Sequence, residues 1–261
     1  MSGTVRTEKD GALGFLIFDH PARRNAISAE MWRQIPGAVE ALAKDDDVRV
    51  VILRGEGETA FVSGADISEF ESRRSGGSAV ADYERAGADA YRAIAAIEKP
   101  TLAMIHGFCV GGGVAIALCA DLRFAADDAR FAVPAAKLGL GYTVALFEPL
   151  LRLVGSARAL EILYTARRYR ADEALAMGLV NSVSPKGMLD SVVRETADRI
   201  AANAPLTLRA VKITERELAR EPAKRDKARI DAAVGACYES EDYREGVRAF
   251  LEKRKPLFKG R

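Results

Sequence analysis

The sequence predicts an α/β protein whose strands and helices alternate in the first part of the chain and whose last part is helical. Two apolar, β-branched runs, Leu13–Phe18 and Val48–Leu53, are bounded by glycine or proline and are typical of strands. Between them, apolar residues of Ala29–Ala43 recur at helical spacing. From about Ser156 onward the patterns are helical. The chain has 261 residues, 49% of them hydrophobic, so we expect one large domain or one domain with an appendage.

The first predicted helix and its flanking strands form a β-α-β unit. Ser28 stands before Ala29 and suits an N-cap, because its hydroxyl can accept a hydrogen bond from a free N–H group of the first helical turn. We expect a right-handed crossover between the two strands. The next predicted elements are the strand Thr101–His106, the buried helix Val114–Ala120 and the strand Leu122–Ala125.

The later part of the chain is predicted to be a series of helices separated by glycine and proline. Gly178 suits a helix C-cap, and Pro205 marks a break before another helix. The stretch Ser72–Ser78, which holds three serines and two glycines, is predicted to be a loop. The predicted helices are Val144–Leu153, Ala157–Tyr164, Ala171–Met177, Met188–Asn203, Leu206–Arg220 and Tyr243–Lys253.

The composition argues against several classes of protein. With 39 basic and 37 acidic residues the net charge is +2, which lacks the strong positive field typical of nucleic-acid binding. Met1–Asp10 contains no apolar core of a signal peptide, and no apolar run reaches the length of a membrane span, so we expect a cytoplasmic protein. The 3 cysteines and 2 histidines lack metal-ligand spacing, so neither a disulfide framework nor a metal site is expected.

Two glycine-containing segments carry the most information about function. Residues 61–67 read Phe-Val-Ser-Gly-Ala-Asp-Ile, and residues 107–113 read Gly-Phe-Cys-Val-Gly-Gly-Gly. In both, a strand is predicted to pass through glycine into a helix. Glycine lets a ligand approach the backbone closely, and a helix N-terminus presents free N–H groups with a partial positive charge. Two such N–H groups that converge on one point would bind a developing oxyanion, although each segment alone also fits an ordinary turn.

In order and spacing these segments resemble the enoyl-CoA hydratase/isomerase (crotonase) family, and the resemblance extends along almost the whole chain. It implies a core of repeated β-β-α turns over residues 1–195, followed by a helical region, residues 196–261, that builds a homotrimer or a dimer of trimers. The matching motifs are His20-Pro21 with Asn25-Ala26, Ser63-Gly64-Ala65-Asp66-Ile67, His106-Gly107 with Gly111-Gly112-Gly113, Cys119-Ala120-Asp121-Leu122-Arg123, Ala174 with Gly178-Leu179-Val180, Ala204-Pro205, and Phe250-Leu251-Glu252-Lys253-Arg254.

The resemblance also implies an acyl-CoA substrate and assigns residues to it. The thioester oxygen is expected to accept hydrogen bonds from the backbone N–H groups of Ala65 and Gly112, an oxyanion hole that stabilises an enolate-like anion. No separate cofactor is implied, because coenzyme A enters as part of the substrate. Arg23 and Arg24 suit phosphate because a guanidinium group offers bidentate hydrogen bonds. The alternative for these arginines, and for the basic residues near the chain end, is a solvated surface. The residues expected to contact coenzyme A are Arg23, Arg24, Ala26, Ala65, Asp66 and Ile67, together with Phe258 and Lys259 of the same or a neighbouring subunit.

The sequence departs from the family pattern at both catalytic acids. Hydratases of the family place one glutamate two residues after the third glycine and another directly after a proline, and these positions are Ala115 and Ala135 here. Alanine cannot transfer a proton, so ordinary hydration by two glutamates is expected to be severely weakened or absent. Isomerising and dehalogenating members carry a carboxylate shortly after the position of Gly139. In this chain the first carboxylate after Gly139 is Glu148.

Tyr142 is the strongest remaining candidate for a catalytic role. The segment Leu138–Tyr142 resembles the Leu-Gly-x-x-Tyr segment of methylmalonyl-CoA-decarboxylating members. A phenol is a reasonable hydrogen-bond donor and a poor base at neutral pH, and simple packing is the alternative role. The other polar residues are assigned structural or surface roles: Glu148 exposed or salt-bridged, Glu69 and Glu71 solvated although within possible reach of the acyl pocket, Asp121 and Arg123 paired, His106 structural, and Cys109 and Cys119 inert.

Three functions fit these residues, in decreasing order of preference. The first is an acyl-CoA enzyme of the hydratase/isomerase type that uses the oxyanion hole and a proton-transfer group not identified from the sequence. The second is a decarboxylase or thioester hydrolase in which the substrate or Tyr142 makes a carboxylate base unnecessary. The third is a non-catalytic acyl-CoA-binding protein. An oxyanion hole alone retains some rate advantage, which favours the catalytic alternatives.

Overall fold

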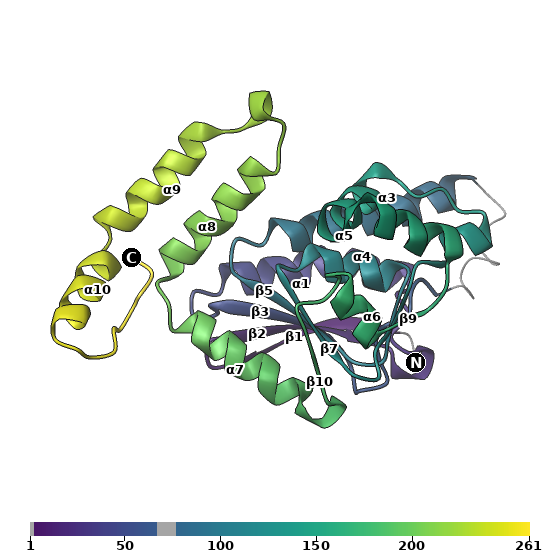
Figure 1. The fold of residues 1–261 in the computed structure, drawn as a ribbon, viewed down its shortest axis with the longest axis horizontal. Helices are drawn as coiled ribbons and strands as arrows, with labels where there is room; N and C mark the ends of the chain where they lie inside the picture. Colours follow the sequence, from purple (N-terminus) through teal and green to yellow (C-terminus); the bar gives the residue numbers. More distant parts are fainter. Residues whose placement is uncertain (1–2, 67–76) are drawn as a thin grey trace.

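The computed structural model describes residues 3–66 and 77–261, and its core contains two β-sheets (Figure 1). All neighbouring strands are parallel except the pairs β1–β2 and β8–β9. The larger sheet has the order β1 (Thr4–Asp10), β2 (Leu13–Asp19), β3 (Val50–Gly55), β5 (Thr101–Ile105), β7 (Leu122–Ala126) and β10 (Ser182–Ser184). The smaller sheet has the order β4 (Ala60–Val62), β6 (Phe108–Val110), β8 (Arg130–Ala132) and β9 (Tyr169–Arg170).

The helices cover the larger sheet on both faces and then leave it. Figure 1 shows α7 on one side of this sheet and α1, α3, α4 and α5 on the other. The α-helices are α1 (Ala29–Lys44), α3 (Gly77–Ala96), α4 (Gly112–Cys119), α5 (Val144–Thr165), α6 (Ala171–Ala176), α7 (Leu189–Ala201), α8 (Pro205–Leu218), α9 (Lys227–Glu239) and α10 (Glu241–Leu251). Short 3₁₀ helices occupy Pro21–Arg23, Pro134–Leu138, Lys186–Met188 and Pro222–Lys224.

The chain advances by repeated β-β-α turns, as the sequence resemblance implies. In three consecutive turns the first strand joins the larger sheet, the second joins the smaller sheet, and a helix follows: β3-β4-α3, β5-β6-α4 and β7-β8-α5. Because β4, β6 and β8 are equivalent strands of successive turns, they lie next to one another and run in the same direction. The segments that follow these three strands therefore meet at one edge of the smaller sheet.

Side chains of β2 explain why this strand reads as a continuous apolar run. Successive side chains of a strand point to opposite faces of its sheet. Leu16 and Phe18 belong to the large core beneath α1 and α3, whereas Phe15 and Ile17 belong to a second core beneath α7. Since both faces are covered by helices, an alternating polar pattern is absent, as is usual for buried parallel strands.

The first predicted β-α-β unit is confirmed, and local signals account for it. The Ser28 hydroxyl accepts a hydrogen bond from the N–H of Met31 at 3.2 Å, and the helix runs over Ala29–Lys44. Strands β2 and β3 on either side of it are parallel. The helices predicted at Val144–Leu153 and Ala157–Tyr164 both lie within α5, and Gly155, whose φ of +76° and ψ of +166° are not helical, separates them.

Two helices, α3 and α9, and the first strand, β1, were not predicted from the sequence. Helix α3 is rich in alanine and buries Ala90 and Ile94, so its apolar stripe is weak compared with that of α1. Strand β1 is mostly exposed, so its side chains show no buried apolar pattern. Its hydrogen-bonded pairing with β2 holds it in the sheet. Gly77 and Ser78 of the predicted loop belong to α3, and the rest of that loop lies outside the described residues.

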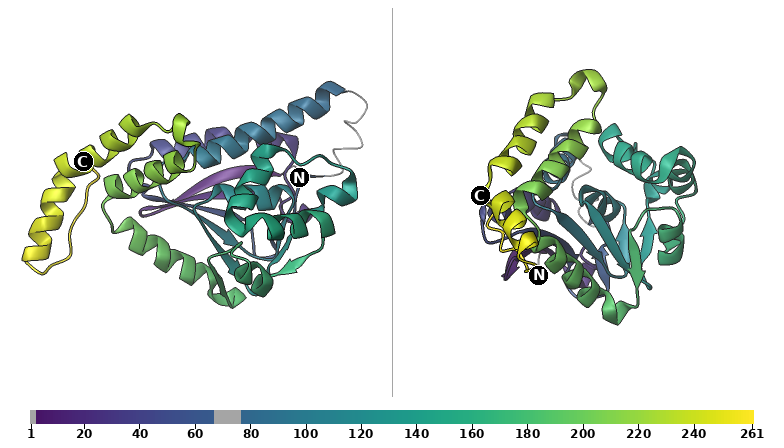
Figure 2. Two further views of the ribbon diagram at one scale, coloured as in Figure 1. Left: turned by 45° about the horizontal axis from the view of Figure 1, so that its top comes forward. Right: turned by 60° about the vertical axis from the view of Figure 1, so that its left-hand side comes forward.

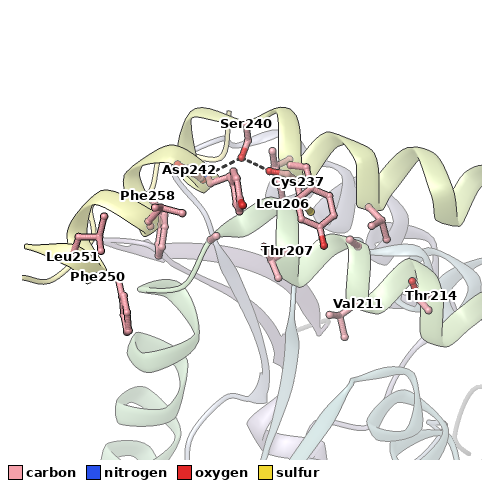
Figure 3. A pocket seen from close by; sticks show the side chains of 17 residues that line it. Leu206, Thr207, Val211, Thr214, Cys237, Ser240, Asp242, Phe250, Leu251 and Phe258 are labelled. Atoms are coloured by element: carbon pink, nitrogen blue, oxygen red, sulfur yellow. Dashed lines mark hydrogen bonds between the residues drawn. The ribbon is translucent and has the colours of Figure 1, made fainter. Parts of the chain in front are cut away.

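The C-terminal helices project from one end of the core (Figures 1 and 2). Helix α7 packs along its whole length against the larger sheet through Leu189, Val193, Ala197 and Ala201, so the boundary expected between residues 195 and 196 falls inside a core helix. The projecting part begins with α8. Between α8 and α10 lies an apolar pocket of about 720 Å³, bordered by Leu206, Val211, Val247, Phe250 and Phe258 (Figure 3).

Lys212 of α8 joins the projecting helices to the core. Its ammonium group donates to the Asp121 carboxylate at 2.7 Å and to the carbonyl of Lys99 at 2.8 Å, and Lys212 is only 8% exposed. Asp121 and Arg123 thus have structural roles, but with different main partners. Arg123 donates to the carbonyls of Ala120 and Leu179, as well as to the backbone carbonyl of Asp121, and not to the carboxylate.

The buried ammonium of Lys212 is expected to make stability depend on pH. Burial lowers the pKa of Lys212 from 10.5 to about 8, partly opposed by Asp121. Between these values the unfolded chain binds more protons than the folded chain, so the free energy of unfolding rises with pH. Between pH 8 and pH 10.5 the free energy of unfolding of the wild type, measured with urea, should therefore rise by up to about 3 kcal/mol relative to that of Lys212→Met. Lys224→Met, at an exposed lysine, serves as the control. Parallel stability profiles for wild type and Lys212→Met would contradict the prediction.

Candidate active site

Three chain segments meet where neighbouring parallel strands of the smaller sheet end. Strand β4 leads into Gly64 and Ala65, strand β6 leads into Gly111 and Gly112, and strand β8 leads into Pro134. A Cβ atom added at Gly111 would lie 4.0 Å from the Cα of Gly64 and 4.0 Å from the Cδ of Pro134. The two glycine segments that the sequence singled out are therefore in contact.

The N–H group of Ala65 points away from the neighbouring Ile27. On one side, the N–H of Ile27 donates to the carbonyl of Gly64 at 2.8 Å, and the N–H of Asp66 donates to the carbonyl of Ile27 at 3.0 Å. Alternate peptide groups of an extended segment point in opposite directions, so the N–H of Ala65 faces away from Ile27. Among the described residues, it donates to no backbone carbonyl.

The N–H group of Gly112 is one of the unpaired donors at the start of α4. Gly112 is the first residue of this helix, and the first N–H groups of an α-helix have no partner within the helix. Gly111 before it has φ +54° and ψ −113°, a backbone conformation that favours glycine. At Gly113 a Cβ atom would lie only 2.1 Å from the carbonyl oxygen of Val62, so the helix start packs directly on β4.

Residues 23–26 border the Ala65 segment. The Ser63 hydroxyl donates to the carbonyl of Arg23 at 3.1 Å, and the N–H of Ser63 donates to the carbonyl of Arg24 at 3.2 Å. The adjacent Ala26 is buried. Residues 23–26 and 63–66 therefore lie next to each other. Ile67 lies outside the described residues.

A second arginine that the sequence did not single out lies beside Arg24. The guanidinium carbons of Arg24 and Arg168 lie 4.8 Å and 5.8 Å from the ring centre of Phe108. Both arginines are exposed, and neither forms an ion pair with any residue in the described ranges 3–66 and 77–261. Because Arg168 comes from the segment between α5 and β9, no local pattern links it to Arg24. Two unpaired guanidinium groups form a suitable site for phosphate.

Within one chain, Phe258 and Lys259 do not join this site. Phe258 borders the pocket between α8 and α10, and its carbonyl accepts a hydrogen bond from Arg49 at 2.5 Å. The N–H of Lys259 donates to Asp242 of α10 at 2.6 Å. In Figure 1 the C-terminus lies at the left of the molecule, away from α4 in the core.

Ala115 and Ala135, which the sequence resemblance aligns with the glutamates of hydratases, lie next to the glycine segments. Ala115 is 5% exposed, and its N–H donates to the carbonyl of Gly111 at 3.2 Å, one turn into α4. Ala135 follows Pro134 and is half-buried. Neither side chain can transfer a proton. Of the carboxylates considered from the sequence, Glu148 is exposed on α5, as expected, and Glu69 and Glu71 lie outside the described residues.

Tyr142 and two further aromatic residues, Tyr91 and Trp32, pack in the large core, and the latter two border Gly112. Burial raises the pKa of Tyr142 to about 12, and its hydroxyl has no hydrogen-bond partner among the described residues. A Cβ atom at Gly112 would lie 3.3 Å from the hydroxyl of Tyr91 and 3.4 Å from the indole ring of Trp32. Sequence reasoning missed Tyr91 because α3 was not predicted, and Trp32 because it fits the buried stripe of α1.

His106 and Cys109 are buried, and Cys119 is half-buried. Burial lowers the pKa of His106, which is 7% exposed. Burial also raises the pKa of the Cys109 thiol well above its ordinary range and that of Cys119 to about 12, so neither forms a thiolate readily.

Within residues 3–66 and 77–261, no group of three or more His, Cys, Asp or Glu side chains is arranged to hold a metal ion. None of the helices in these ranges has the length and apolarity needed to cross a bilayer.

Comparison with known proteins identifies the family. The family model described as enoyl-CoA hydratase/isomerase matches residues 8–261. The chain belongs to the enoyl-CoA hydratase/isomerase family. A crotonyl-CoA hydratase from Syntrophomonas wolfei is 37% identical over 251 residues, which are 96% of each chain. A carnitinyl-CoA dehydratase from Salmonella agona is 33% identical over 265 residues, and the match covers 100% of both chains.

Solved structures of the same family share the fold. The crystal structure of an enoyl-CoA hydratase/carnithine racemase from Magnetospirillum magneticum aligns with a TM-score of 0.92 at 36% identity, covering 100% of this chain and 97% of that one. The α/β architecture of β-β-α turns followed by C-terminal helices is therefore that of the family. This chain is accordingly an enzyme of the hydratase/isomerase family that processes acyl-CoA.

Proposed function

We propose that this enzyme stabilises a thioester enolate in an oxyanion hole formed by the N–H groups of Ala65 and Gly112. The observation that carries the proposal is the contact between the ends of β4 and β6, which brings Gly64 within 4.0 Å of a Cβ atom placed at Gly111. Both donors belong to backbone that is held rigidly, by Ile27 on one side and by the packing of α4 on Val62 on the other. Donors fixed before the reaction stabilise charge as it develops, without reorganisation.

The coenzyme A part of the substrate is proposed to lie along residues 23–26 and Ala65–Asp66. Arg24 and Arg168 are exposed beside Phe108 and are suited to the phosphates. The acyl group would then extend from the oxyanion hole toward the side chains behind Gly112. Phe258 and Lys259 are proposed to reach the coenzyme A site of a neighbouring subunit, because they lie far from it within one chain.

A panel of three thioesters tests the reaction class. Crotonyl-CoA, a 3-enoyl-CoA and methylmalonyl-CoA report hydration, isomerisation and decarboxylation, and the products are separated by liquid chromatography and identified by mass. Turnover of at least one thioester is expected, with hydration slow because Ala115 and Ala135 cannot transfer protons. Binding of every thioester without turnover of any would contradict a catalytic role. The remaining function would then be acyl-CoA binding without catalysis.

A decarboxylase or thioester hydrolase is the second candidate, and the buried hydroxyl of Tyr142 favours it. This hydroxyl has no partner among the described residues, and its raised pKa keeps it protonated at neutral pH. It can therefore donate a hydrogen bond to the substrate. Loss of carbon dioxide leaves an enolate directly and needs no carboxylate base. Unchanged methylmalonyl-CoA turnover in Tyr142→Phe would exclude this role.

We further propose that the C-terminal helices form a homotrimer or a dimer of trimers. Phe250, Leu251 and Leu257 are 84%, 74% and 75% exposed, and together with the pocket between α8 and α10 they make a large apolar surface. Apolar patches of this kind usually mark protein interfaces.

Charge placed on this surface is expected to dissociate the oligomer. The Phe250→Glu variant should sediment or scatter light as a smaller species than the wild type, because a buried unpaired carboxylate opposes association. The control is Tyr164→Glu, at an aromatic residue of α5 that is 76% exposed. A wild type that is monomeric in light scattering, or a Phe250→Glu variant of unchanged mass, would contradict the interface.

A further inference from the structure

Three side chains from separate elements form a cluster behind the proposed oxyanion hole, and we call it the aromatic cluster. It consists of Trp32 from α1, Tyr91 from α3 and Tyr142 from the segment before α5. The rings of Trp32 and Tyr91 meet edge to face with centres 5.1 Å apart. All three side chains pack in the same hydrophobic core.

Tyr91 and Trp32 of the aromatic cluster border the backbone of Gly112. A Cβ atom at this glycine would lie 3.3 Å from the hydroxyl oxygen of Tyr91, and 3.4 Å and 3.6 Å from two carbons of the Trp32 ring. The absence of a side chain at Gly112 therefore leaves the Tyr91 hydroxyl next to the start of α4. A substrate bound at the N–H of Gly112 would have its acyl group close to this cluster.

Among residues 3–66 and 77–261, the polar atoms of the aromatic cluster have no hydrogen-bond partner. The indole N–H of Trp32 and the hydroxyl of Tyr142 are buried and form no hydrogen bond within the described ranges, and Trp32 is only 2% exposed. The hydroxyl of Tyr91 likewise forms no hydrogen bond to a described residue. Buried polar groups are nearly always hydrogen-bonded in native proteins, so the buried polar atoms of Trp32 and Tyr142, together with the hydroxyl of the half-buried Tyr91, indicate a ligand that pairs with them.

The charge state of the cluster limits the kind of ligand. Burial raises the pKa of Tyr142 to about 12, and burial together with Cys119, Tyr83 and Tyr142 raises the pKa of Tyr91 far above its ordinary value. Both phenols are therefore neutral at physiological pH and can donate, as can the indole N–H. A buried carboxylate needs a compensating positive charge, which phenols and an indole do not supply. The cluster is thus better suited to a neutral acceptor oxygen.

We propose that Trp32, Tyr91 and Tyr142 bind a neutral oxygen substituent, a hydroxyl or keto group, on the acyl chain of the substrate. This assignment rests on the proposed function, since it places the acyl group beside Gly112. It makes the three residues determinants of specificity. An unsubstituted acyl chain would leave the buried donors unpaired and is therefore disfavoured relative to an oxygen-bearing chain.

Calorimetric binding of three matched thioesters tests the assignment. Butanoyl-CoA has no oxygen on its chain, whereas 3-hydroxybutanoyl-CoA and 4-hydroxybutanoyl-CoA carry a hydroxyl at two different positions. The wild type is expected to bind at least one hydroxylated thioester about three- to tenfold more tightly than butanoyl-CoA. Tyr91→Phe keeps the ring and removes the donor, so it should reduce this preference to near unity, and Tyr142→Phe should reduce it as well. Tyr164→Phe, at the exposed tyrosine of α5, should leave the preference unchanged.

The outcomes separate this assignment from the proposed function. Equal binding of the three thioesters by the wild type, or a preference that survives both Tyr91→Phe and Tyr142→Phe, overturns the role of the aromatic cluster and leaves the oxyanion hole untouched. Tighter binding of malonyl-CoA than of either hydroxylated thioester overturns the choice of a neutral oxygen. Failure of the folded wild type to bind any of the thioesters contradicts the proposed function itself. Thermal unfolding of each variant establishes that it is folded before binding is compared.

Discussion

Replacement of Gly112 by proline is expected to lower the turnover number for any acyl-CoA substrate by about 10²–10³-fold, the usual effect of losing one oxyanion donor. Proline lacks an N–H group, and the first position of an α-helix tolerates it well because the N–H there has no helical partner. Gly112 occupies this first position of α4. The substitution therefore removes the proposed donor with little effect on the helix. Steady-state kinetics with the best thioester of the panel measures the loss.

Gly112→Ala is the matched control for this experiment, because it adds a Cβ atom but retains the N–H group. That atom would lie 3.3 Å from the Tyr91 hydroxyl, a tight contact that small side-chain movements can relieve. We expect Gly112→Ala to retain most of its turnover number, whereas Gly112→Pro loses it. Equal losses in the two variants would show that crowding, and not the N–H group, determines the effect. Full activity of Gly112→Pro would show that this N–H group plays no part in catalysis.

The double variant Ala115→Glu/Ala135→Glu is expected to hydrate crotonyl-CoA faster than the wild type by at least about 10²-fold, since each positioned acid–base group typically contributes 10²–10⁴-fold. The structure places both alanines beside the proposed oxyanion hole: Ala115 one turn along α4 from Gly111, and Ala135 directly after Pro134. Ala115 is 5% exposed, so a glutamate there is expected to be partly desolvated and to have a raised pKa. Loss of the conjugated thioester absorbance of crotonyl-CoA measures the rate.

The corresponding double glutamine variant controls for size and polarity, because glutamine matches glutamate in shape and cannot transfer a proton. If the glutamate variant is folded and binds crotonyl-CoA but is no faster than the glutamine variant, the alanines do not occupy positions suitable for proton transfer. A wild type that already hydrates crotonyl-CoA rapidly would show that another residue supplies the proton. Tyr142 and Glu148 would then be the first residues to substitute, Tyr142 because its hydroxyl is buried and has no hydrogen-bond partner among the described residues.

Several parts of the structure follow from local sequence signals. Helix α1 could be placed because Ser28 caps it and because its apolar residues repeat at helical spacing. Strand β2 could be placed because helices cover both faces of its sheet, which makes the strand continuously apolar. Helix α3 escaped prediction because its buried face is built largely from alanine, whose small side chain gives little contrast between the two faces of a helix.

The sequence by itself determined the family and indicated Ala65 and Gly112 as candidate site residues. This was possible because the glycine segments and their spacing are visible in the order of residues. It also predicted that Ala115 and Ala135 stand where hydratases of the family have glutamates. Only the tertiary structure decided that the two glycine segments are in contact, since this depends on the parallel pairing of β4 with β6. Likewise, Arg168 meets Arg24 on Phe108, and Trp32 meets Tyr91 behind Gly112, through packing of elements far apart in the chain. Such contacts leave no periodic signal in the sequence. The pattern around each residue reflects only its own helix or strand, and the path of the chain through the fold determines which residues become neighbours.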